Sequence, residues 1–169
     1  MDNKYNTFSG RFWAGIIDSF ILLPFLLLDF IFLKPDNNLM LVIFWLLVSY
    51  SLYFVYSILL HWKYGQTIGK QVMKVRVVDV SELKGLHFSQ AFLRDSIPLL
   101  IQIAIMIKLV VVTIQIGHYD EVGIYEETQM LSYVSLVWFL IEVVTMLTNK
   151  KRRALHDFIA KTVVVNNKA

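Results

Sequence analysis

The sequence has no cysteine among its 169 residues, which excludes disulfide bonds and any chemistry that depends on a thiol. Charged residues are also scarce: they make up 17% of the chain, whereas a soluble domain has about 25%. Apolar residues account for 57%, above the roughly 45–50% that is typical of soluble domains. This composition predicts a membrane protein.

Four long apolar runs lie along the chain. They cover residues 12–33, 39–60, 95–117 and 131–148. A helix rises about 1.5 Å per residue, so roughly 20 apolar residues cross the hydrocarbon core of a bilayer. The sequence therefore predicts an all-α membrane protein with four transmembrane helices, arranged as two antiparallel hairpins, in a single domain that covers residues 1–169. The lipid bilayer is its expected surrounding.

The basic residues are distributed unevenly between the predicted loops. Fourteen of the 16 lie in residues 1–11, 61–94 and 149–169. Of the other two, Lys34 lies in the loop between the first two apolar runs and Lys108 lies inside the third run. Because lysine and arginine accumulate in cytoplasmic loops, we expect both termini to be cytoplasmic, in the cell (inner) membrane. Basic residues beside apolar runs face anionic headgroups, so no nucleic-acid partner is expected. The loop of residues 118–130, on the opposite side of the membrane from the basic segments, is acidic.

The segments 61–94 and 149–169 contain two patterns typical of short strands. Residues 74–80 and 162–165 are rich in β-branched side chains, and an isolated strand would leave its backbone groups without partners. We therefore expect the two to pair as a small sheet. Residues 65–70, before the first strand pattern, form a turn-rich element, and residues 151–160, before the second, have the pattern of an amphipathic interfacial helix.

Charged side chains inside the apolar runs require an explanation, because each costs roughly 2.5–3.5 kcal/mol at the centre of a membrane helix. Arg11, Asp18 and Asp29 are spaced to lie on one face of the first helix, and Glu142 lies at a depth similar to that of Asp18. The two acids could share a proton or a monovalent cation. Alternatively, Asp18 pairs with an arginine and Glu142 only holds helices together. Lys108 could reach the outer interface or pair with Asp29.

Two patterns that suggest an enzyme do not meet the requirements of their motifs. The stretch from Gly65 to Lys70 has three residues between its glycines and no Ser or Thr after the lysine, so it is not a phosphate-binding loop. The pair His156 and Asp157 has no second His/Asp cluster in the sequence to complete a metal site. We therefore expect no enzyme activity, no metal and no cofactor.

Several separated motifs occur along the chain. An arginine and an aspartate open the first helix, a Gly-Gln-Thr-Ile-Gly-Lys signature follows in the loop, Arg-Asp opens the third helix, and His-Asp lies in the tail. The residues of these motifs are Arg11, Asp18, Gly65, Thr67, Gly69, Lys70, Arg94, Asp95, His156 and Asp157. Their types and order resemble the RDD family of small integral membrane proteins. For the second aspartate of the family name, Asp157 fits best, with Asp95 and Asp79 as alternatives.

The resemblance implies transport, including exchange of cations for protons, or a regulatory role as a membrane partner of other proteins. In the first case Asp18 and Glu142 would bind the cation or proton and Arg11 would act as their countercharge. Four helices are few for a transporter, so a homo-oligomer is expected, with Ala14 and Gly15 offering a small-residue face. In the second case the basic cytoplasmic face would bind a protein or an anionic lipid. In both cases we expect an ionic cluster of Arg11, Arg94, Asp95, His156 and Asp157.

Overall fold

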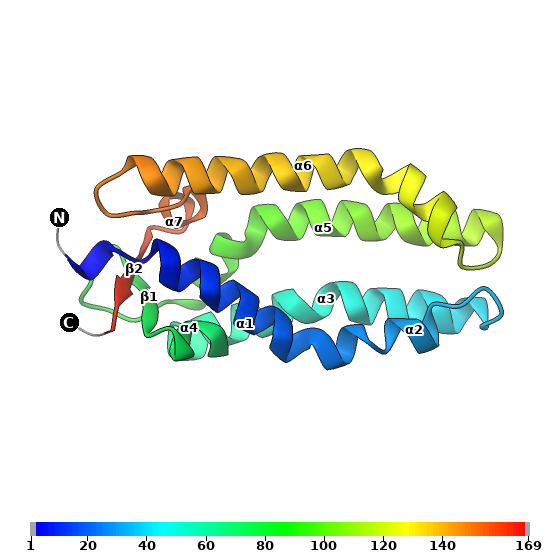
Figure 1. Cartoon of the computed structure of the whole chain (residues 1–169), viewed down its shortest axis with the longest axis horizontal. Coiled ribbons are helices and arrows are strands. Elements are labelled where there is room, and N and C mark those ends of the chain that lie inside the picture. The colour runs from blue at the N-terminus through cyan, green and yellow to red at the C-terminus, as the bar shows by residue number, and fades with distance from the viewer. Residues whose placement is uncertain (1–2, 168–169) are drawn as a thin grey trace.

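Four long helices form the body of the protein in its computed structural model, which describes residues 3–167 (Figure 1). They are α1 (Phe8–Leu26), continued by the short α2 (Asp29–Phe32), then α3 (Leu39–Tyr64), α5 (Phe88–Ile116) and α6 (Glu121–Thr148). Each of the four segments is long and apolar enough to cross a membrane. The prediction of four transmembrane helices is confirmed.

The helices extend beyond the apolar runs that predicted them. α5 begins at Phe88, inside the predicted loop 61–94, and α6 begins at Glu121, inside the predicted outer loop 118–130. Charged residues such as Glu126 are good helix formers, so an apolar run shows only the lipid-facing part of a helix. Gly117, in the left-handed conformation with φ 84°, ends α5. The connection between α5 and α6 therefore shrinks to residues 117–120.

The helices pack in the order α1, α3, α5, α6. α3 packs along α5 and α5 along α6, whereas α1 contacts mainly the short helix α4 (Ile68–Val72). Ala14 is fully buried in this contact with α4, so it is not available to the predicted oligomer interface; Gly15 is exposed. Large apolar side chains such as Phe20, Phe44 and Leu100 point outward, as expected for a surface covered by lipid.

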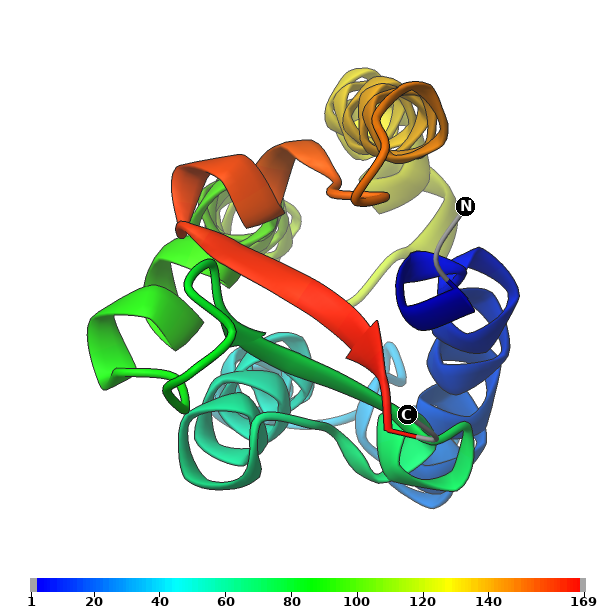
Figure 2. The ribbon, with the colours of Figure 1, turned by 90° about the vertical axis from the view of Figure 1, so that its left-hand side faces the viewer.

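A two-stranded sheet lies across one end of the bundle, which we call the sheet end (Figure 2). β1 (Val75–Asp79) and β2 (Thr162–Asn166) are antiparallel, with Val75 opposite Asn166 and Asp79 opposite Thr162. Val75, Val77 and Val164 form a small core with Leu86. The predicted pairing of the loop strand with the tail strand is confirmed.

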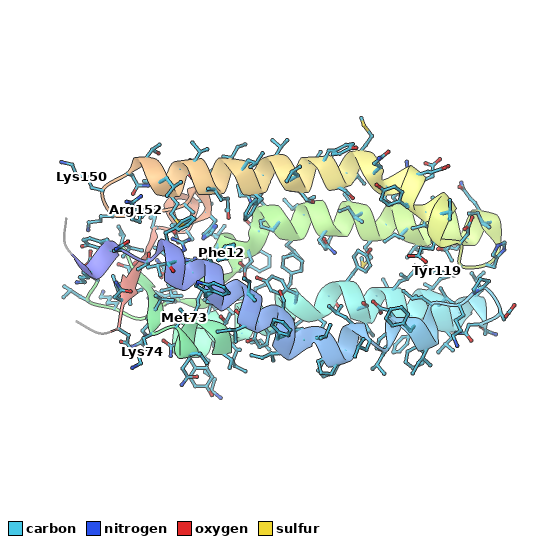
Figure 3. All side chains as sticks on the ribbon, viewed as in Figure 1. Phe12, Met73, Lys74, Tyr119, Lys150 and Arg152 are labelled. Carbon is cyan, nitrogen blue, oxygen red and sulfur yellow. The ribbon has the colours of Figure 1, made fainter. Side chains whose placement is uncertain are left out.

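The sheet end also carries the described ends of the chain and most of the basic loops. The 3-10 turn η1 (Asn3–Tyr5) and the short helix α7 (Leu155–Ile159) lie there (Figure 1). The labelled side chains of Lys74, Lys150 and Arg152 lie at this end, and that of Tyr119 at the opposite, far end (Figure 3). Lys168, counted among the basic residues of the tail, lies outside the described residues.

The tail helix is shorter than the predicted helix over residues 151–160. Arg152 has a positive φ of 50°, which interrupts the helical path before α7 begins at Leu155. Asn149 fixes this turn, because its side chain accepts a hydrogen bond from the backbone N–H of Arg153 and donates one to the Arg153 carbonyl. The turn brings α7 back over the end of the bundle.

Candidate functional site

Five charged or titratable side chains from four helices meet at the sheet end. Arg11 comes from α1, Arg94 from α5, Glu142 from α6, and His156 and Asp157 from α7. We refer to these five residues as the ionic cluster. Four of them were predicted to lie together, and Glu142 joins them through His156. Asp95, the other predicted member, is not part of the ionic cluster and accepts a hydrogen bond from Ser57 instead.

Asp157 is the centre of the ionic cluster and is completely buried. Its Oδ2 lies 2.9 Å from Arg11 Nη1, and its Oδ1 lies 2.5 Å from Arg94 Nη1. It also accepts the backbone N–H of Ala154 at 3.0 Å, which fastens the first turn of α7. Burial raises the pKa of Asp157, but the two guanidinium groups lower it more, so the pKa lies well below its usual range. The carboxylate stays ionised.

The contacts of His156 define which of its nitrogens carries the proton. Its Nε2 lies 3.1 Å from Arg11 Nη2 and 2.8 Å from Arg94 Nη2. Guanidinium nitrogens only donate hydrogen bonds, so Nε2 accepts and the proton is on Nδ1, which donates to Oε1 of Glu142. Burial and the nearby Arg94 lower the pKa of His156, which favours this neutral form. Two arginines then balance two carboxylates in the ionic cluster.

Asp18 connects α1 to the loop signature and forms no ion pair within residues 3–167. It accepts hydrogen bonds from Tyr56 Oη and Thr67 Oγ1, both at 2.6 Å, and from the backbone N–H of Gly69 at 2.7 Å. The predicted pairing of Asp18 with an arginine is therefore wrong. The requirement for glycine is direct, because a Cβ at Gly69 would lie 2.1 Å from the carbonyl oxygen of Ala14.

The turn of the loop signature is built by its own residues. Gly65 ends α3 with φ 72°, a conformation that favours glycine, and its N–H donates to the His61 carbonyl. Thr67 caps α4 and at the same time donates its hydroxyl proton to Asp18. This geometry places Lys70 inside the bundle.

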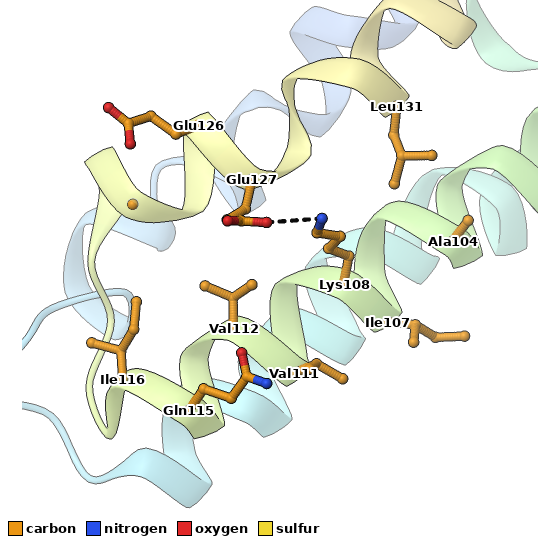
Figure 4. A pocket seen from close by; sticks show the side chains of 11 residues that line it. Ala104, Ile107, Lys108, Val111, Val112, Gln115, Ile116, Glu126, Glu127 and Leu131 are labelled. Carbon is orange, nitrogen blue, oxygen red and sulfur yellow. Dashed lines mark ion pairs between the residues drawn. The ribbon is translucent and has the colours of Figure 1, made fainter.

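The remaining charges inside the spans lie towards the far end. Asp29 accepts hydrogen bonds from Trp45 Nε1 at 2.6 Å and Ser49 Oγ at 3.2 Å. Lys108 pairs with Glu127 at 2.8 Å, beside a cavity of about 830 Å³ between α5 and α6 (Figure 4). The predicted pair of Lys108 with Asp29 is therefore not formed.

A second cavity, of about 440 Å³, lies beside the ionic cluster, and we call it the central cavity. Asp18 and Glu142 both line it, as do the cationic side chains of Arg11, Lys70 and Arg94. Aromatic residues complete the wall: Phe8, Phe12, Tyr53 and Phe139. The two acids predicted to lie at equal depth thus face one space, although each is already hydrogen-bonded to other residues.

Three further contacts join Lys70 and Asp95, which the sequence singled out, through His61 and Ser57, which it did not. Lys70 Nζ lies 2.6 Å from His61 Nε2, His61 Nδ1 lies 3.1 Å from Ser57 Oγ, and Ser57 Oγ donates to Asp95 Oδ2 at 2.7 Å. Ser57 and His61 are four residues apart on α3, a spacing that places them on one face. This spacing was the feature of the sequence from which a contact between Ser57 and His61 could have been predicted. Asp95 belongs to this chain of contacts and not to the ionic cluster.

These observations define a class of protein: a small multi-pass membrane protein in which arginines from two helices converge on one buried aspartate of the tail. The chain belongs to the RDD family, whose model matches residues 5–161. No curated protein and no solved structure matches it. The family assignment therefore rests on the family model, which covers every element from Tyr5 to α7.

Proposed function

We propose that this protein exchanges a monovalent cation for protons across the membrane and that the central cavity is its binding site. The observation that carries the proposal is that two intramembrane carboxylates face one cavity. Asp18 and Glu142 line it together with the cations of Arg11, Lys70 and Arg94, and Asp157 lies behind them, paired with both arginines. With His156 neutral, these three carboxylates balance the three cations while Lys70 is protonated, and one net negative charge remains once Lys70 has lost its proton.

A net negative charge away from water is costly unless a counter-ion compensates it. A proton or a small cation entering the central cavity would provide that compensation. Asp18 and Glu142 are exposed to the cavity, whereas Asp157 is closed off by the two arginines. Asp18 and Glu142 are therefore the acids whose charge an incoming cation would meet.

The experiment is cation-driven proton flux in proteoliposomes, with wild-type protein, Asp18→Asn and Glu142→Gln. We expect flux with at least one monovalent cation, and a strong loss of flux in both variants. Glu126→Gln is the matched control, because Glu126 is an exposed glutamate of α6 at the far end. The proposal is wrong if wild-type protein gives no flux under any cation gradient.

A second candidate function is that of a non-transporting accessory protein that binds a partner protein or anionic lipid on its basic sheet end. It is favoured by the saturation of the acids: Asp18 accepts three hydrogen bonds and Asp157 two arginines. In that case the buried charged side chains serve only to stabilise the fold. Wild-type protein would then give no more proton flux than empty liposomes under any cation gradient, and crosslinking in cells would identify the partner.

A further inference from the structure

Four polar side chains form an unbroken line of hydrogen bonds from the central cavity into the interface between α3 and α5. In order they are Lys70, His61, Ser57 and Asp95, and we call this line the relay. Its three steps measure 2.6, 3.1 and 2.7 Å. His61 and Ser57, in the middle, are almost completely buried, so bulk water does not reach their polar atoms. Lys70 lines the cavity.

The donors along the relay all point in the same direction. An ionised carboxylate only accepts, so the Ser57 hydroxyl donates to Asp95. The Ser57 oxygen then accepts a hydrogen bond from the protonated Nδ1 of His61. Nε2 of His61 therefore accepts a hydrogen bond from the Lys70 ammonium. A proton can therefore pass along the whole relay without any side chain first reversing its role.

We propose that the relay is the path by which Lys70 gains and loses its proton, which makes Lys70 the proton-carrying group of the central cavity. This inference rests on the proposed function, since the proton that leaves Lys70 is the counterpart of the cation that enters. In the outward step Lys70 gives a proton to His61 Nε2, Nδ1 of His61 gives its own to Ser57, and Ser57 passes its proton to Asp95. The carboxyl group of Asp95, a partly exposed residue, then releases the proton. Loading Lys70 is the same sequence in reverse.

The surroundings of Lys70 favour easy loss of this proton. Burial, followed by the charges of Arg94 and Arg11, lowers the pKa of Lys70 to about 7. Both forms are thus populated at physiological pH. The charged and titratable groups around it, from every helix that borders the cavity, are Arg11 and Asp18 of α1, Tyr53 and His61 of α3, Arg94 and Asp95 of α5, Glu142 of α6, and His156 and Asp157 of α7.

The protonation state of Lys70 determines whether the cavity attracts a cation. While Lys70 is an ammonium, its charge offsets part of the negative charge of Asp18 and Glu142. After it loses its proton, the carboxylates of Asp18, Glu142 and Asp157 exceed the two arginines by one negative charge, and a monovalent cation is attracted in place of the proton. Cation and proton then compete for one site, which is the requirement for exchange.

The first test removes the middle of the relay without changing any charge. Ser57→Ala should reduce cation-driven proton flux in proteoliposomes by about 100-fold, the order of the effect of a positioned proton donor. Ser57→Thr, which keeps the hydroxyl, should restore most of the flux. Ser51→Ala is the matched control, because it removes an exposed hydroxyl from the same helix that bonds only to backbone carbonyls. Equal flux in Ser57→Ala and Ser51→Ala would overturn the relay while leaving the exchange function intact.

The second test does not depend on flux. In protein labelled with ¹⁵N at lysine Nζ and held in lipid nanodiscs, the Lys70 signal should titrate with a midpoint near 7, and its proton exchange should slow in Ser57→Ala. If wild-type protein shows no flux, the proposed function fails, and this measurement alone decides the relay. A Lys70 that stays protonated throughout the neutral range would exclude the relay whatever the flux shows.

Discussion

At the scale of single residues, Asp157 has the largest expected effect on stability, because two buried arginines depend on it. Asp157→Asn removes the negative charge between Arg11 and Arg94 and leaves two guanidinium groups buried with insufficient compensation. Breaking a buried ion pair from one side costs about 3–5 kcal/mol. We expect a clear drop of the melting temperature in detergent. Asp36→Asn, an exposed aspartate of the far-end loop, is the control and should change stability by less than about 0.5 kcal/mol.

The dependence of this effect on pH follows from the lowered pKa of Asp157. The carboxylate is ionised in the folded protein at pH values where it is protonated in the unfolded chain. Its contribution is therefore fully present above the unfolded pKa of about 3.9 and is lost as the pH falls below it. The difference between wild type and Asp157→Asn should stay constant from neutral to mildly acidic pH. Equal melting of the Asp157 and Asp36 variants would show that the ionic cluster does not stabilise the fold.

The sequence alone predicted the members of the ionic cluster better than it predicted their partners. Arg11, Arg94 and Asp157 were predicted to lie together because each belongs to a family motif and each lies near the same membrane surface in the predicted topology. The partners of Asp18 could not be predicted in the same way. They depend on the rotation of α1 against α3 and α4, which is determined by packing in three dimensions and not by the spacing along one helix.

At the scale of elements, the contact of α1 with α4 is the most sensitive to added volume. In Gly69→Ala the new Cβ would lie 2.1 Å from the Ala14 carbonyl oxygen and 2.8 Å from Asp18 Oδ1, so the backbones of the two helices must separate. Overpacking costs typically about 1–3 kcal/mol, and here it also weakens the hydrogen bond from the Gly69 N–H. We expect a lower melting temperature and reduced flux.

The control for this variant is Gly85→Ala. An added Cβ at Gly85 would meet no atom within 4 Å, and φ there is not positive, so this change should alter stability by less than about 0.5 kcal/mol. If Gly69→Ala and Gly85→Ala melt at the same temperature, the close approach of α4 to α1 does not exist in the membrane.

The elements differ in how well the sequence predicted them. The two strands followed from their β-branched runs, because a strand must find a partner and the chain offers few. The tail helix was predicted too long, since nothing in residues 149–154 indicates that Arg152 adopts a positive φ. Helix ends were also displaced, because charged residues beyond an apolar run continue a helix at little cost.

At the scale of the whole molecule, the charges differ sharply between the two ends. Among the described residues, thirteen lysines and arginines lie in residues 3–11, 61–94 and 149–167, which belong to the sheet end, whereas the far end has the acidic residues of the α5–α6 connection and the start of α6. The positive-inside rule therefore predicts that the sheet end faces the cytoplasm. The orientation matters for function, because it defines the side from which the central cavity, the relay and the sheet are reached.

The absence of cysteine makes this orientation directly measurable, because each single-cysteine variant carries only one reactive thiol. Leu83→Cys tests the sheet end, where Leu83 is 89% exposed, and Asp36→Cys tests the loop at the far end. In intact cells a membrane-impermeant maleimide should label Asp36→Cys and not Leu83→Cys, and both should react after permeabilisation, which controls for thiol reactivity. The opposite pattern would place the sheet end outside. The central cavity, which lies beside the ionic cluster at the sheet end, would then be reached from the outside.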